Sequence, residues 1–106
     1  MNAAAASDAF QADYCAKRLK VLSDPSRLRI IDLLRQGEMT VGDIAGFLET
    51  EIATVSHHLQ ILKRSQFVTP RRDGKYIYYR LATGLFQNCG REKKTLYLGC
   101  CKIDVP

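Results

Sequence analysis

Four cysteines are the residues of this chain best suited to bind a soft metal ion: Cys15, Cys89, Cys100 and Cys101. No secretory signal precedes them, so we expect thiols or metal ligands rather than a disulfide framework. Cys100 and Cys101 are adjacent, and a helix cannot bury two successive side chains in one apolar stripe. Gly99 loosens the backbone and would let both sulfur atoms face one ion. The alternative is a pair of incidental tail thiols.

Position alone leaves the roles of Cys15 and Cys89 open. Cys15 is in helical phase with Leu19 and Leu22, which favours packing, although it could be a ligand contributed across a dimer. In an unbroken helix Cys89 would lie ~16 Å from Cys100. It could join the same site only if the tail folded back, or across a dimer, and it fits a small buried hydrophobic residue equally well.

The preferred ligand follows from the number of thiolates. Three thiolates suit pyramidal trivalent arsenic or antimony, and two suffice for a methylated or aryl arsenical that carries its own carbon substituent. Cadmium or lead, which usually takes three or four sulfur ligands, ranks second. A redox or persulfide switch through the cysteines ranks third.

Polar side chains of another kind lie on one face of a predicted recognition helix, residues 51–64. Apolar residues recur on the opposite face with the period of a helix, at Ile52, Val55, Leu59 and Leu62. Hydroxyl, amide and imidazole groups can read base edges in a major groove, while Lys and Arg bind phosphates. We therefore predict DNA contacts by Thr54, Ser56, His57, Gln60, Lys63 and Arg64. The alternative is an ordinary amphipathic helix whose polar face carries little charge. His58 is expected to be a half-buried packing residue.

Four further helices accompany the recognition helix in the predicted fold. Residues 41–49 form a short helix that, with the recognition helix and a tight turn, makes a helix-turn-helix. Helices are also predicted over residues 7–21 and 25–36, the second starting at the N-cap Asp24 followed by Pro25. A last helix is predicted from residue 83 or 84 to about residue 98.

Residues 67–81 are predicted to form a β-hairpin directly after the recognition helix. Segments rich in aromatic and β-branched residues flank Asp73-Gly74, a dipeptide favoured by type I′ hairpin turns. Arg71, Arg72 and Lys75 cluster at the tip. They predict a basic wing that binds the minor groove or its phosphates. The alternative is a hairpin kept soluble by surface charge.

The net charge of +5 over 106 residues is unevenly distributed. Residues 51–82 carry +4 and residues 83–106 carry +2, whereas residues 1–24 are neutral and residues 25–50 carry −1. This asymmetry favours a polyanionic partner such as nucleic acid. No apolar run approaches the ~20 residues that span a bilayer, so we expect a cytoplasmic protein without a membrane partner.

The order of these elements, together with three motifs, resembles the ArsR/SmtB family of winged-helix repressors that respond to metals and metalloids. The motifs are residues 22–30 (LSDPSRLRI), 54–59 (TVSHHL) and 73–79 (DGKYIYY), and the resemblance covers residues 12 to 97. It implies a mainly α winged helix-turn-helix with a β-hairpin wing, in the order α-α-α-α-β-β-α. It also implies a homodimer through the first and last helices that binds double-stranded operator DNA with an inverted repeat.

The predicted elements also divide the chain into three parts. We expect residues 1–6 to be disordered, residues 7–98 to form the DNA-binding and dimerisation domain, and residues 99–106 to be a tail carrying the cysteine pair. One sensor site of the family reads ELCVCDL, and here Thr40 and Gly42 stand where its two thiols would be. A second site uses Asp and His on the last helix, but both histidines of this chain lie on the recognition helix.

With these two sensor sites absent, the remaining candidate is the adjacent cysteine pair, which is similar to the pair in arsenic- and antimony-responsive members of the family. The resemblance thus implies a repressor that binds DNA when empty and releases it when Cys100 and Cys101, with Cys89 and Cys15 as further candidates, capture the inducer. Two rival classes are a small thiol enzyme that uses Cys100 and Cys101, and a winged-helix interaction module that never binds DNA. The chain has no Cys-x-x-Cys motif and no recognisable acid–base pair, so we predict that it is not an enzyme.

Overall fold

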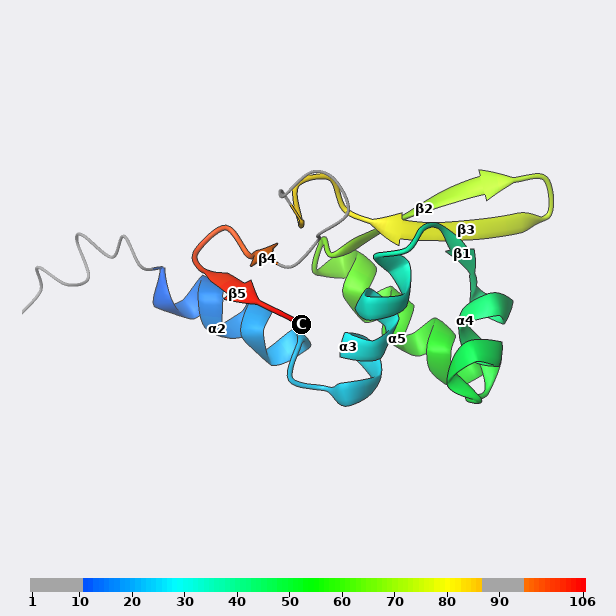
Figure 1. Ribbon diagram of the computed structural model, residues 1–106, viewed down its shortest axis with the longest axis horizontal. Helices are drawn as coiled ribbons and strands as arrows, with labels where there is room; N and C mark the ends of the chain where they lie inside the picture. Colours follow the sequence, from blue (N-terminus) through cyan, green and yellow to red (C-terminus); the bar gives the residue numbers. More distant parts are fainter. Residues whose placement is uncertain (1–10, 87–94) are drawn as a thin grey trace, which may run out of the picture.

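The computed structural model describes residues 11–86 and 95–106, so the expectations for residues 1–6 and for Cys89 lie outside the described part. Figure 1 shows helices packed beneath a β-hairpin, with a second, smaller hairpin at the other end of the molecule. The helices are α2 (Ala12–Val21), α3 (Pro25–Leu34), α4 (Val41–Leu48) and α5 (Ile52–Arg64). The strands are β1 (Met39–Thr40), β2 (Val68–Asp73), β3 (Tyr76–Leu81), β4 (Thr95–Tyr97) and β5 (Lys102–Asp104).

Side-chain caps fix where two of the helices begin. The Asp24 carboxylate accepts hydrogen bonds from the backbone amides of Ser26 at 2.8 Å and Arg27 at 3.3 Å, and Pro25 occupies the first position of α3. Thr40 and Asp43 form a reciprocal capping box at the start of α4. The predicted start of the second helix is therefore confirmed, and α4 and α5 follow as the predicted helix-turn-helix.

Strands β2 and β3 form the predicted wing, and the short strand β1 joins them in a three-stranded antiparallel sheet of order β1-β3-β2. The sequence analysis did not predict β1. Asp73 pairs with Tyr76, so the two turn residues are Gly74 and Lys75. Gly74 has φ of +62°, whereas Lys75 is not among the residues with positive φ. Positive φ at the first turn position only is typical of a type II′ turn, so the predicted type I′ geometry is wrong.

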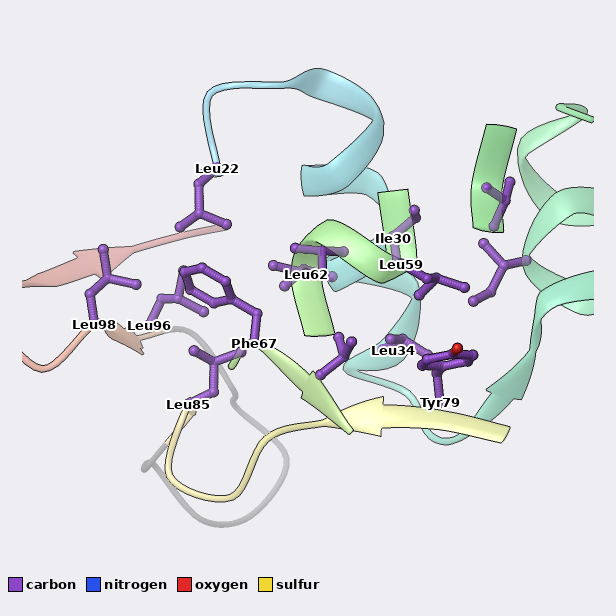
Figure 2. Packing of buried hydrophobic residues seen from close by; sticks show 14 of the residues in the cluster. Leu22, Ile30, Leu34, Leu59, Leu62, Phe67, Tyr79, Leu85, Leu96 and Leu98 are labelled. Carbon is purple, nitrogen blue, oxygen red and sulfur yellow. The ribbon is translucent and has the colours of Figure 1, made fainter. Parts of the chain in front are cut away.

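The hydrophobic core fills the space between the helices and the two hairpins (Figure 2). Phe67, which is fully buried, lies just after α5 and packs between the helix-turn-helix and the C-terminal hairpin. Leu98 and Leu22 reach the same region from the C-terminal hairpin and the end of α2. The C-terminal segment therefore shares one core with the winged helix. The other buried members are Ile30, Ile31, Leu34, Ile44, Ala45, Val55, Leu59, Leu62, Val68, Tyr79, Leu85 and Leu96.

The predicted last helix is wrong in the residues that the structure describes. Residues 95–97 form β4, which pairs with β5 so that Leu96 lies opposite Ile103, and Leu96 also bridges Phe86. Leu96 and Leu98 are both buried. Side chains two positions apart share a face in a strand but not in a helix. Burial of this alternating pair therefore favours the strand over the helix.

Within residues 11–86 and 95–106, none of the helices combines the length and the apolar character that crossing a membrane would require.

Candidate functional site

Three cysteines from opposite ends of the sequence meet in one cluster. Cys15 is buried on α2, while Cys100 and Cys101 lie in the turn between β4 and β5. Cys15 and Cys100 form a disulfide, and Cys101 is a free thiol whose Sγ lies 3.4 Å from Sγ of Cys15 and 3.9 Å from Sγ of Cys100. All three sulfur atoms lie within 4.8 Å of one another, close enough to bind one ion.

The disulfide corrects the expectation that the cysteines are free thiols or ligands. The Cα atoms of Cys15 and Cys100 are 5.7 Å apart, which is within the range that a disulfide spans. The contact also lies within one chain, whereas the sequence analysis considered Cys15 a packing residue or a ligand from across a dimer. Local periodicity could not reveal a contact between residues separated by 85 positions.

A tight turn directs both tail cysteines towards α2. The amide of Leu98 donates a hydrogen bond to the carbonyl of Cys101 at 2.9 Å, which closes the turn. Gly99 has φ of +89°, a backbone conformation that favours glycine. A Cβ at this position would lie 3.6 Å from the Tyr14 hydroxyl, so Tyr14 packs directly against the turn. The expected flexibility of Gly99 stays a prediction, while its positive φ places it in the turn before the cysteine pair.

An open cavity of about 840 Å³ borders the cluster. Its wall includes Tyr14, Tyr97, Cys100, Cys101 and Lys102. Cys100 and Cys101 are half-buried at this cavity, whereas Cys15 is buried.

The exposed face of α5 carries most of the residues predicted to bind DNA. Val55, Leu59 and Leu62 are buried as predicted, whereas Ile52 is 60% exposed at the start of the helix and does not join the core. On the opposite face, Ser56 is half-buried, and the exposed residues are Thr54, His57, Gln60, Lys63 and Arg64. The structure thus aligns hydroxyl, imidazole, amide and basic groups along one helix.

His58 packs beneath that face, as the sequence analysis predicted. Its Nδ1 lies 3.2 Å from Nη1 of Arg27, whose Nε donates a hydrogen bond to the Val21 carbonyl at 2.6 Å. The side chain is half-buried. His58 therefore connects α5 to Arg27 of α3, which in turn binds the last residue of α2.

The three basic residues predicted at the tip of the wing have different surroundings. Arg72 and Lys75 are exposed near the turn. Arg71 instead binds Glu38, with Nη2 to Oε1 at 2.8 Å and Nε to Oε2 at 3.0 Å, and its guanidinium lies over the Tyr78 ring. The hydrogen bond from Arg71 is the main reason that the pKa of Glu38 is lowered. The sequence analysis missed this partner because Glu38 is 33 residues away.

A profile of the bacterial regulatory protein, arsR family, matches residues 24–69, which include α3, α4 and α5. The transcriptional repressor SdpR of Bacillus subtilis is 45% identical over 69 residues, which cover 65% of this chain and 77% of SdpR. The chain belongs to the ArsR family. Its family and its winged helix-turn-helix fold were both predicted correctly.

Two further relatives of this ArsR-family chain are an arsenical resistance repressor and a homodimeric DNA-binding domain. The arsenical resistance operon repressor of Staphylococcus xylosus is 44% identical over 63 residues, which cover 59% of this chain and 61% of that repressor, less than two thirds of its length. The homodimeric winged helix-turn-helix DNA-binding domain of a possible ArsR-family regulator from Mycobacterium bovis is 42% identical. That structure superposes with a TM-score of 0.63 and covers 67% of this chain and 66% of the other. The relatives are transcriptional regulators, in agreement with the prediction that this chain is not an enzyme.

Proposed function

We propose that this ArsR-family protein is a repressor that binds operator DNA when its cysteines are empty and releases it on capturing trivalent arsenic or antimony. The observation that carries the proposal is the cluster of Cys15, Cys100 and Cys101, whose sulfur atoms lie within 4.8 Å of one another. The arsenical resistance operon repressor among the relatives supports the same inducer class. Cys89, a further candidate ligand, lies outside the described residues.

The donor set suits a soft, trivalent centre. A thiol reductant first supplies two electrons and two protons to the Cys15–Cys100 disulfide, giving two thiols while the reductant becomes its own disulfide. The three thiols of Cys15, Cys100 and Cys101 then displace the three hydroxyl groups of arsenous acid. Three As–O bonds are replaced by three As–S bonds, and three water molecules leave. An organoarsenical with one carbon substituent would use two of the same thiols.

DNA binding is proposed for the exposed face of α5 and for the wing. Exposed hydroxyl, imidazole and amide groups of Thr54, His57 and Gln60 are suited to base edges, as is the half-buried hydroxyl of Ser56. Phosphate contacts are proposed for Lys63, Arg64, Arg72 and Lys75. Arg71 is proposed as a phosphate contact too, but its ion pair with Glu38 would compete with phosphate for the guanidinium.

A homodimer is proposed because an inverted-repeat operator requires two copies of α5. Apolar side chains on α2 and α3 remain exposed, with Leu19 at 40% and Leu28 at 44%. The homodimeric relative from Mycobacterium bovis supports this assembly. With β4 and β5 in place of the predicted last helix, the interface would involve the exposed apolar side chains of α2 and α3.

Fluorescence anisotropy of a duplex that the reduced protein selects from a random pool would test the proposal. We expect arsenite to release the wild-type protein but to leave Cys15→Ser, Cys100→Ser and Cys101→Ser bound. Cys89→Ser is measured beside them, and its response decides whether Cys89 is a ligand. Release by cadmium alone would favour the cadmium alternative, and release by an oxidant alone would favour the redox alternative. Duplex affinity that does not fall with salt would contradict DNA repression altogether.

A further inference from the structure

Arg18 connects the helix that carries Cys15 to the end of the recognition helix. Nη1 of Arg18 donates a hydrogen bond to the carbonyl of Ser65 at 2.6 Å, and Ser65 is the C-cap of α5. The guanidinium carbon lies 4.3 Å from the centroid of the Phe67 ring and 5.6 Å from that of Tyr14. This contact joins residues that are 47 positions apart in the sequence.

The contact is suited to hold the end of α5 in place. The last carbonyls of a helix have no partner within the helix, and a cation near them interacts favourably with the helix dipole. Phe67, which Arg18 also contacts, is fully buried, and its amide donates to the carbonyl of Leu62 in the last turn of α5 at 2.8 Å. Arg18 therefore binds both the cap of α5 and the residue that anchors this cap in the core.

Arg18 lies on the same side of α2 as Cys15. Residues three positions apart are neighbours on a helix surface, so a shift of Cys15 also moves Arg18. Figure 1 shows α2 and the β4–β5 hairpin together at one end of the molecule, with α4 and the wing at the other. Binding of an ion by Cys15, Cys100 and Cys101 fixes the position of α2 relative to that hairpin. Because α2 also carries Arg18, a change in this position changes the contact of Arg18 with Ser65.

The Arg18 contact is also incompletely satisfied. Its Nε is buried and has no hydrogen-bond partner among the residues of 11–86 and 95–106. A buried donor without a partner is unfavourable. A small displacement of α2 can therefore change how the guanidinium binds the end of α5.

We propose that Arg18 is the positioning residue that transmits occupancy of the cysteine cluster to the recognition helix. This inference rests on the proposed arsenic-responsive function and assigns the route by which inducer binding changes DNA affinity. Bound inducer moves α2, so that the contacts of Arg18 with Ser65 and Phe67 change. The end of α5 then takes a new position. The operator complex then loses affinity because the two recognition helices of a dimer no longer match their half-sites.

The test compares wild type, Arg18→Met and Lys20→Met under reducing conditions. Arg18→Met keeps an apolar stem but loses the charge and the hydrogen bond, while Lys20→Met removes a charge from an exposed position of the same helix. Three quantities are measured for each: operator Kd without arsenite, operator Kd with saturating arsenite, and bound arsenic per chain. Thermal unfolding midpoints show whether the variants are folded.

In wild type and Lys20→Met the two operator Kd values should differ by roughly 5–150-fold, the usual range of allosteric coupling. In Arg18→Met the ratio should fall to within about twofold of one, while arsenic stoichiometry and operator binding without arsenite persist. If Arg18 had a merely structural role, its loss would weaken operator binding but leave the ratio of the two operator Kd values unchanged. A wild-type ratio in Arg18→Met would therefore overturn the proposal.

If Arg18→Met does not fold, Arg18→Lys decides, because an ammonium group keeps the charge but cannot stack as a planar guanidinium does. Its ratio must also fall, and an unchanged ratio would overturn the role of Arg18. A wild-type protein that binds the operator yet ignores arsenite would overturn the proposed inducer and this route with it. Failure of the proposed role of Arg18 and failure of the proposed inducer therefore give different results.

Discussion

At the level of single residues, Gly99 determines whether the two tail sulfur atoms can face Cys15. Its φ of +89° would cost a side-chain-bearing residue about 1–3 kcal/mol, whereas a Cβ there would meet Tyr14 only at ordinary van der Waals distance. We expect Gly99→Ala to lower both the free energy of unfolding in urea and the affinity for arsenite. Gly46→Ala is the control, because a Cβ there meets nothing within 4 Å and a helix favours alanine. Wild-type stability and arsenite affinity in Gly99→Ala would contradict this account of the turn.

Asp24 makes the start of α3 sensitive to pH. Burial alone would raise the pKa of Asp24, but hydrogen bonds from the amides of Arg27 and Ser26, with the nearby Arg27 charge, lower it. A carboxylate whose pKa is lower in the folded state stabilises the protein at neutral pH, and this contribution is lost as pH falls through the folded pKa. We expect Asp24→Ala to cost about 1 kcal/mol at pH 7.

The difference in unfolding free energy between wild type and Asp24→Ala should shrink as the pH is lowered below the ordinary Asp range. Urea unfolding across a pH series would measure it, with the exposed Asp13→Ala as the matched control. A difference that stays constant down to strongly acidic pH would show that Asp24 does not act through its charge.

At the level of elements, the surroundings of the wing arginines predict unequal contributions to DNA binding. Arg72→Ala and Lys75→Ala should each reduce the slope of log affinity against log salt by ~0.9, the loss of one phosphate contact. Arg71→Ala should change the slope less, because Arg71 is already paired with Glu38. Anisotropy titrations at several salt concentrations would measure the slopes. A larger effect for Arg71 than for Arg72 would mean that DNA binding breaks the Glu38 pair.

Local signals in the sequence predicted the helices and the wing but not the C-terminal hairpin. Asp24-Pro25 and the 3.6-residue period of Val55, Leu59 and Leu62 act within one element, so they can be read without knowing the fold. The last segment carries two competing patterns, since Leu85, Phe86 and Leu96 approximate a helical period while Leu96 and Leu98 alternate. Packing of Leu96 and Leu98 in the core decides in favour of the strand.

The candidate site was predictable only in part for a related reason. The adjacent pair Cys100-Cys101 after a glycine is a local signal and was recognised. The partnership of Cys15 with this pair, and of Arg71 with Glu38, depends on tertiary contacts between distant segments. Residue spacing within one segment of the sequence does not predict such contacts.

For the molecule as a whole, the exposed apolar side chains of α2 and α3 predict a homodimer. Leu19→Glu should convert the dimer into a monomer and weaken operator binding by roughly 10²-fold, because two linked recognition helices bind far more tightly than one. Ala16→Glu, which makes the same change of charge at an exposed position of the same helix, is the control. Sedimentation equilibrium measures the mass. A monomeric wild type, or a dimeric Leu19→Glu, would show that this face is not the interface.

The most direct test of the account is X-ray absorption at the arsenic edge on the reduced protein loaded with one arsenite per chain. We predict three sulfur neighbours and no oxygen neighbour around arsenic in wild type. Cys15→Ser should retain fewer sulfur neighbours and gain oxygen. The same arsenic environment in wild type and Cys15→Ser would contradict a single inducer site built from Cys15, Cys100 and Cys101.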